Sequence, residues 1–197
     1  FGRQKQKAID NCSNNWVLIL DADERIPPET ALEISKLIND QTGKSAYNLP
    51  RKNFFLGKWI KHAGWWPDYV VRLIDKRKCQ MSPHLVHESI EVNGNTGTIG
   101  KPITHYATRS IDHTMEKMNR YSSEGAKEMF DNGETATYTK ALARGFWAFF
   151  YNYFFRGGFL DGSQGFIIAT SDAANKFFKY AKLVELIGKE NYTLGRD

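Results

Sequence analysis

Residues 14–29, NNWVLILDADERIPPE, join an apolar run to a cluster of acidic residues and then to two prolines. The run at 16–20, WVLIL, has the length of a strand, and an unbroken apolar strand is typical of a parallel sheet covered by helices on both faces. Pro27 and Pro28 favour the start of a helix. The apolar stripe of that helix would be Ala31, Ile34, Leu37 and Ile38. The stretch therefore predicts a strand, an acidic segment and a helix, as in an α/β domain.

Asp21 and Asp23 stand directly after the predicted strand, where open α/β sheets bind their ligands. Side chains two residues apart in an extended segment project to the same side, so the two carboxylates can converge on a cation. Oxygen ligands favour Mg²⁺ or Mn²⁺, which also bind phosphate oxygens. The structural alternative is that Asp23 or Glu24 only stabilises the N-terminus of the following helix. The buried strand before the aspartates favours the metal and diphosphate site.

The composition describes a folded protein of 197 residues, 41% hydrophobic and 25% charged. The formal net charge is +5 and the basic residues are scattered, so nucleic-acid binding is only weakly indicated. Anionic phosphates and an acidic membrane surface are equally compatible with this charge. Cys12 and Cys79 lie far apart without CxxC or Cys/His spacing. The sequence therefore predicts two free thiols rather than a zinc site or a disulfide framework.

The rest of the chain divides near residue 108 into an α/β part and a helical tail. Strands or extended segments are predicted at 46–57, 69–77, 89–94 and 97–106, with glycines as turns. From Ile111 onward the spacing of apolar residues is helical and predicts no further strand. The chain opens at Phe1 and enters a predicted helix at once, so we expect that an upstream part of the α/β domain precedes it.

Four segments occur in an order that resembles a known family. They are GRQKQKAIDNCSNNWVLILDADERIPPE, LPRKNFFLGKWIKHAGWWPDYVVRLIDK, VHESIEV and ITHY. Together they resemble family 2 glycosyltransferases with the GT-A fold, and within that family the beta-glucosyltransferase-like proteins of bacterial lipopolysaccharide core synthesis. The resemblance covers nearly the whole chain, and one departure is Gln6, where such sequences often carry Asn. It implies a Rossmann-like GT-A catalytic core at 1–108 that lacks its first strands, followed by the helical region 109–197.

The resemblance implies an inverting, metal-dependent glycosyltransferase. It would move a hexose from a nucleotide-sugar, most simply a UDP-hexose, to a lipid-linked saccharide of the lipopolysaccharide core or another cell-envelope glycan. Asp21 and Asp23 would bind Mg²⁺ or Mn²⁺, and His105 in THY would complete the coordination. Asp21, Arg3 and Lys5 would face the donor diphosphate, although the basic residues equally suit a solvated face. Because family members bind the nucleotide base with the missing N-terminal strands, the fragment is expected to bind donor poorly.

An inverting transfer also needs a base that deprotonates the acceptor hydroxyl. The resemblance implies that Glu88 in VHES is this base, and Asp68 in WWPDY is the next candidate. The acceptor wall would be built by HAGWWPDYVVR and VHES, with the candidates Gly64, Trp65, Trp66, Arg72 and His87. The alternatives are structural: the tryptophans can form a core pair, Arg72 can pair with Asp75 or Glu88, and His84 and His87 can simply line the site.

The helical tail contains an aromatic-rich stretch at 144–169, RGFWAFFYNYFFRGGFLDGSQGFIIA. Its unbroken apolar part is too short to cross a bilayer, which needs about 20 residues. Tyr and Trp favour the membrane interface, and nearby cations can meet anionic headgroups: Arg144, Arg156, Lys176, Lys179 and Lys182. We therefore expect peripheral attachment to a membrane surface, which the resemblance places on the cytoplasmic face of the inner membrane. The alternative is a helical hairpin that packs on the core or in a dimer.

Other functions remain open at this stage. The chain can be a noncatalytic membrane-interface module in which the acidic cluster is only a helix cap. It can also be a glycosyltransferase that acts on a protein or on a polyprenyl phosphate. A nucleic-acid-binding domain is disfavoured because the aromatic residues cluster in the helical tail rather than on strands.

Overall fold

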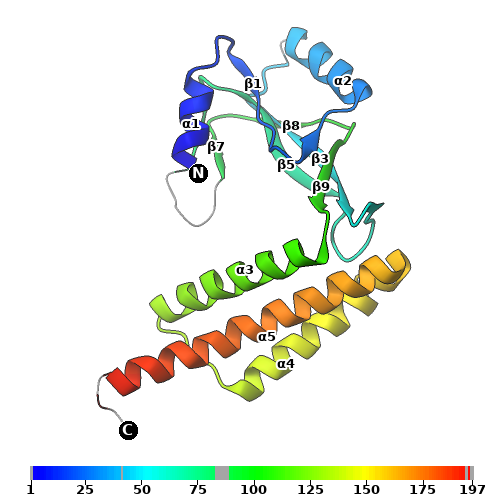
Figure 1. Cartoon of the computed structure of the whole chain (residues 1–197). Helices are drawn as coiled ribbons and strands as arrows, with labels where there is room; N and C mark the ends of the chain where they lie inside the picture. The colour runs from blue at the N-terminus through cyan, green and yellow to red at the C-terminus, as the bar shows by residue number, and fades with distance from the viewer. Residues whose placement is uncertain (1, 41, 83–88, 194, 196–197) are drawn as a thin grey trace. The chain divides into compact units, whose positions relative to one another are not determined.

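The computed structural model describes residues 2–40, 42–82, 89–193 and 195 (Figure 1). The chain divides into two compact units. The first, which we call the sheet unit, consists of Phe1–Asn53 and Trp66–Ala107. The second, the helical unit, consists of Phe54–Trp65 and Thr108–Asp197. The helical unit thus includes residues 54–65, which the sequence analysis placed in the α/β part.

The sheet unit is built on a mixed sheet. Its helices are α1 (Gly2–Asp10) and α2 (Pro28–Asn39), and its strands are β1 (Trp16–Leu18), β2 (Glu24–Arg25), β3 (Ala46–Phe55, whose last two residues belong to the helical unit), β5 (Asp68–Asp75), β6 (Cys79–Met81), β7 (Ile90–Val92), β8 (Thr96–Thr98) and β9 (Ile103–Thr108). The order in the main sheet is β1-β5-β3-β9-β2, and β8 also pairs with β3. The β1–β5, β3–β5 and β2–β9 pairs are antiparallel, whereas β3 and β8 are parallel. The predicted mixed α/β class is confirmed, while the GT-A fold itself stays a prediction.

The apolar run that begins at Trp16 forms a shorter strand than predicted, and its partner runs in the other direction. β1 ends at Leu18 and pairs antiparallel with β5. Val17 is buried in a cluster with Ile9 of α1, and Trp16 and Leu18 pack on a second cluster that contains Ile34 of α2. Because both faces of β1 are covered, the run is continuously apolar although its partner is antiparallel.

The predicted helix after the prolines is α2. It begins at Pro28, directly after Pro27 at the N-cap, and Ile34 is buried as expected. Ala31 is exposed, and the neighbouring Thr30 is buried instead. The hydroxyl of Thr30 donates a hydrogen bond to the Pro102 carbonyl (2.7 Å), so α2 is fixed to the segment that leads into β9.

The helical unit contains β4 (Lys58–Trp59), α3 (Ile111–Asp131), α4 (Tyr138–Phe150), the π-helical turn η1 (Tyr151–Phe155), the 3₁₀ turn η2 (Gly158–Asp161) and α5 (Gly162–Thr193). Ser110 caps α3 and Thr137 caps α4, each through its hydroxyl oxygen. Helix α5 lies beside both α3 and α4 (Figure 1). No helix in the described part of the chain is long and apolar enough to cross a membrane.

Candidate functional site

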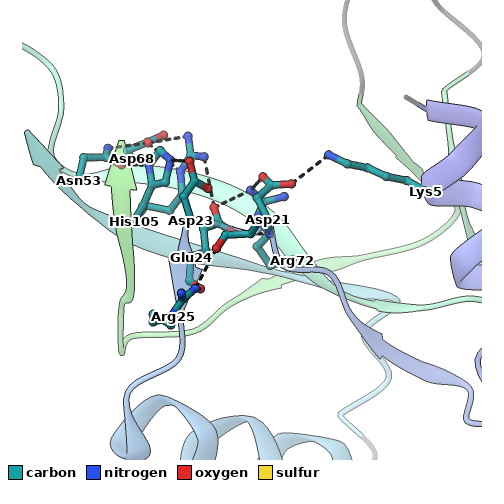
Figure 2. A network of polar contacts seen from close by, with 11 residues as sticks. Lys5, Asp21, Asp23, Glu24, Arg25, Asn53, Asp68, Arg72 and His105 are labelled. Carbon is teal, nitrogen blue, oxygen red and sulfur yellow. Dashed lines mark hydrogen bonds and ion pairs between the residues drawn. The ribbon is translucent and has the colours of Figure 1, made fainter. Parts of the chain in front are cut away.

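The acidic segment after β1 forms a turn rather than a continuation of the strand. The Glu24 N–H donates to the Asp21 carbonyl (3.0 Å), and β2 then pairs with β9 so that Glu24 lies opposite His105. On the other side, the Ile19 N–H donates to the Arg72 carbonyl of β5 (2.8 Å). The turn therefore places its carboxylates between side chains of β5 and β9 (Figure 2).

Arg72 joins two of these carboxylates. Its Nη2 atom lies 2.5 Å from Asp21 Oδ2 and 2.6 Å from Glu24 Oε1. Both Arg72 and Glu24 are buried, and Lys5 Nζ of α1 lies 3.1 Å from Asp21 Oδ1. Partial burial alone would raise the pKa of Asp21, but the Arg72 and Lys5 cations outweigh it and hold that pKa below its usual range. Asp21 is therefore ionised at neutral pH.

A second group of contacts links β3, β5 and β9. Arg51 of β3 lies opposite Asp68 of β5, with Nε and Nη2 at 2.9 and 2.8 Å from Asp68 Oδ2. The side-chain amide of Asn53 donates to the same oxygen (2.8 Å). Arg51 Nη1 is also 3.5 Å from Glu24 Oε1. Arg51 thus connects Asp68, the second candidate for the base, to the acidic turn.

His105 connects this network to Asp23. Its Nδ1 atom lies 2.6 Å from Asn53 Oδ1, and its Nε2 atom lies 3.5 Å from Asp23 Oδ2. Because the Asn53 amide nitrogen donates to Asp68, the Asn53 oxygen is the atom that faces the ring, and an oxygen of this kind can only accept. Nδ1 therefore carries a proton, and His105 directs its other nitrogen toward Asp23 (Figure 2).

The two aspartates face different partners. Asp21 faces Arg72 and Lys5, whereas Asp23 faces His105. Among the described residues, no three His, Cys, Asp or Glu side chains form a group that could hold a metal ion. Asp23 and His105 supply one oxygen and one nitrogen ligand, a pair that suits Mn²⁺. Oxygen atoms of a diphosphate and of water would have to complete the coordination of the metal. The metal-binding roles of Asp21, Asp23 and His105 stay predictions.

A cavity of about 370 Å³ adjoins Asp21. Its charged lining residues are Lys5, Arg51, Arg72 and Asp21, so three cations face one carboxylate. The remaining wall comes from Ile19, from Val70 and Val71 of β5, and from Met81, Ser89 and Ile90. Its volume lies in the range of small-molecule sites. Lys5, Arg51 and Arg72 give its wall N–H donors that suit an anionic ligand, although each of these cations also pairs with a carboxylate of the network.

The other predicted acceptor residues have structural roles of their own. Arg72 is occupied by Asp21 and Glu24, while Asp75 pairs with Arg77 (2.6 Å). Gly64 and Trp65 belong to the helical unit. Gly64 has a φ of +76°, and a Cβ there would lie 1.7 Å from the Arg156 guanidinium. Trp65 packs edge-on against Phe55, with ring centroids 5.8 Å apart.

Glu88, His84 and His87 lie outside the described residues, and so does the side chain of Arg3 in α1. Trp66 belongs to the sheet unit and is half-buried. Their predicted roles remain predictions.

Three residues of the network were missed at the sequence level: Glu24, Arg51 and Asn53. Glu24 was considered only as a helix cap, although it is 2% exposed. Arg51 and Asn53 are two apart in β3 and so share a face of the strand. The sequence signal for them is weak, because Lys52 between them turns the pair into an unbroken polar run without alternation.

Comparison with known proteins adds a family context. No protein-family model matches the chain. An uncharacterized glycosyltransferase of Rickettsia typhi is 28% identical over 205 residues, which cover 98% of this chain and 70% of that protein. An uncharacterized glycosyltransferase of Rickettsia prowazekii is 27% identical over 205 residues, which again cover 98% of this chain and 70% of that protein. The lipopolysaccharide core biosynthesis glycosyltransferase LpsC of Rhizobium meliloti is 27% identical over 94% of this chain and 69% of LpsC. Over nearly its whole length, the chain is therefore a homologue of bacterial proteins named glycosyltransferases.

Proposed function

We propose that this chain is the catalytic part of an inverting glycosyltransferase that moves a hexose from a nucleotide-sugar to a lipid-linked saccharide. UDP-hexose is the donor that we expect, and lipopolysaccharide core or a related envelope glycan is the expected product. The similarity to LpsC supports the acceptor class, because its name refers to lipopolysaccharide core biosynthesis. The observation that carries the proposal is a polar network that links Asp21, Asp23, Asp68 and His105, in which Asp21 lines a cavity together with Lys5, Arg51 and Arg72.

The cavity gives the donor diphosphate a place to bind. Lys5, Arg51 and Arg72 all line it, and each is already held by a carboxylate of the network. Preset cations of this kind attract a diphosphate without a large loss of side-chain freedom. The apolar wall from Val70, Val71 and Ile90 would exclude water from one side of the ligand.

Asp23 and His105 are the residues best arranged to hold a divalent cation together with the diphosphate. When bound, such a cation neutralises the charge that develops on the leaving group. Asn53 would keep His105 in the tautomer that directs Nε2 to the cation, and Asp68 in turn orients Asn53. Asp21 would take part through its ion pairs with Lys5 and Arg72, which adjoin the cavity.

Two carboxylates remain candidates for the base that deprotonates the acceptor hydroxyl. Glu88 is the first choice from the resemblance. Asp68 is the second, and its Oδ2 atom is fixed by Arg51 and Asn53. Glu88→Gln and Asp68→Asn would separate the two candidates in a sugar-transfer assay with an active form of the protein. The variant that removes the base should have a lower kcat and a nearly unchanged KM for the donor.

The proposal is tested by the binding of UDP to this chain in the presence and absence of MnCl₂, measured by isothermal titration calorimetry. We expect weak binding that depends on Mn²⁺, because the proposed diphosphate contacts belong to this chain whereas the strands that would bind the nucleotide base do not. Asp23→Asn and His105→Gln should weaken it about 10- to 100-fold or more, because the loss of even an outer-sphere partner costs this much at metal sites.

Matched controls are Asp40→Asn and His113→Gln, which make the same chemical changes at two exposed positions, the C-cap of α2 and the first turn of α3. These should bind UDP and Mn²⁺ as the unchanged protein does. If Asp23→Asn and His105→Gln kept full Mn²⁺-dependent affinity, the metal assignment would be wrong. If no nucleoside diphosphate bound under any condition, the assignment of the cavity would be wrong.

A further inference from the structure

The helical unit carries a continuous aromatic surface on α4, η1, η2 and the start of α5. Ring contacts with centroids 4.9–6.4 Å apart link its members in an unbroken network. They are Phe146, Trp147, Phe149, Phe150, Tyr151, Tyr153, Phe154, Phe155, Phe159 and Phe166. We call this set the aromatic surface. Phe146 is 71% exposed and Phe155 is 68% exposed, so the set is not the core of the unit.

The segment that carries nine of the ten rings has charges of one sign. Residues 138–160 contain Lys140, Arg144 and Arg156 and no aspartate or glutamate. The first acidic residue beyond them, Asp161, is buried, and its carboxylate accepts backbone hydrogen bonds from Lys61 and His62. The segment therefore offers apolar rings and positive charge only. This combination is complementary to an apolar layer bordered by anionic groups.

A lipid bilayer surface has this chemistry. The described helices do not include one that could cross a membrane, but a helix that lies in the plane of the interface needs only one apolar face and flanking cations. Trp147, Tyr151 and Tyr153 combine an apolar ring with a polar edge, and such side chains favour the headgroup level. We propose that the aromatic surface docks on an anionic lipid bilayer, with α4 and η1 lying in the plane of the interface.

A second copy of the chain fits this surface less well. In a symmetric dimer, the same patch meets itself, so Lys140, Arg144 and Arg156 would approach their own counterparts. Residues 138–160 contain no carboxylate of their own to compensate this repulsion, and Asp172 of α5, which interacts with Arg156, is largely buried. Anionic headgroups provide the missing negative charge, and each cation near such a surface strengthens binding. The charge pattern therefore favours the lipid surface over self-association.

The proposal is tested by flotation of the full chain with vesicles of phosphatidylcholine alone and with about 30% phosphatidylglycerol. We expect binding to the anionic vesicles. The double variant Phe146→Glu/Phe155→Glu should bind the anionic vesicles at least about tenfold more weakly, because it places negative charge where the rings would insert into the bilayer. Lys140→Gln/Arg144→Gln should weaken binding to the anionic vesicles by about fivefold per cation and leave binding to neutral vesicles unchanged.

The matched control is Leu32→Glu/Tyr192→Glu, which adds the same charge at exposed apolar positions outside the aromatic surface. Circular dichroism checks that each variant is folded. The proposal is overturned if the unchanged chain does not float with anionic vesicles, or if the aromatic and control variants bind alike. It is also overturned if Phe146→Glu/Phe155→Glu abolishes a dimer seen by sedimentation velocity while no vesicle binding exists. The assay contains no sugar donor or acceptor, so its result is independent of the proposed transferase activity.

Discussion

At the scale of single residues, Arg72 determines the geometry of the acidic turn. It binds Asp21 and Glu24 from β5, and Glu24 is buried so deeply that water cannot replace the guanidinium. A buried carboxylate that loses its cation keeps the cost of desolvation without the compensating attraction. The turn is therefore expected to depend more on Arg72 than on any exposed ion pair of the chain.

We predict that Arg72→Met lowers the free energy of unfolding by about 3 kcal/mol, measured by urea denaturation. Arg51, 3.5 Å from Glu24, keeps the effect near the lower end of the usual range. The double variant Arg72→Met/Glu24→Gln should recover part of the loss, since it removes the unpaired charge. Lys127→Met breaks an exposed ion pair with Asp131 on α3 and should change stability little. A loss in Arg72→Met no larger than in Lys127→Met would contradict this account.

Local sequence motifs identify candidate site residues but not the contacts between residues that are far apart in the sequence. Asp21, Asp23, Asp68 and His105 were identified as candidates because local motifs contain them. The partner of Arg72 was left open between a phosphate on the acceptor, Asp75 and Glu88. In the structure Arg72 pairs with Asp21, 51 positions away, and with Glu24. Such a pair follows from strand register, which brings β5 beside the end of β1. No local spacing in the sequence carries that information.

At the scale of elements, burial was easier to predict than strand direction. The apolar run WVLIL correctly indicated a strand covered on both faces, and the prolines correctly located the start of α2. The parallel partner was wrong because α1 and α2 cover β1 regardless of the direction of its neighbour. An unbroken apolar run indicates that both faces of a strand are covered, but it does not indicate the direction of the neighbouring strand. The antiparallel partner of β1 is β5, whose residues lie about 55 positions later in the sequence.

The junction between η1 and α5 contains a polar contact within the aromatic-rich hairpin. The Asn152 amide donates to Asp172 Oδ2 (3.0 Å). Burial raises the pKa of Asp172 to about 6, although Lys176 and Arg156 oppose the shift. The protonated form is thus the one that this hairpin accommodates best.

This raised pKa gives a prediction for the hairpin as an element. Between about pH 4 and pH 6 the folded state binds more protons than the unfolded state, so stability should fall as pH rises through this window and then level off. The contribution is at most about 3 kcal/mol. Asp172→Asn keeps an acceptor for Asn152, so it should raise the melting temperature above pH 6 and reduce the pH dependence. Asp131→Asn, at an exposed position, should keep the original profile; the same profile for Asp172→Asn would exclude the assignment.

At the scale of the whole molecule, the two candidate functions lie in different units. Every residue of the polar network and its cavity belongs to the sheet unit. Every ring of the aromatic surface belongs to the helical unit. The chain passes between the units three times, after Asn53, after Trp65 and after Ala107. The proposed ligand binding and the proposed lipid binding would thus use separate sets of side chains on one continuous chain.

We therefore predict that the two activities can be removed one at a time. The Asp23→Asn variant should bind UDP in the presence of Mn²⁺ about 10- to 100-fold more weakly, or weaker still, and should float with anionic vesicles as the unchanged chain does. Phe146→Glu/Phe155→Glu should show the opposite pattern, with normal calorimetric UDP binding and weak flotation. The reason is that neither change removes a contact in the other unit. If either variant lost both activities while its circular dichroism spectrum stayed native, the sites would be energetically coupled, and the description of two independent functional units would have to be abandoned.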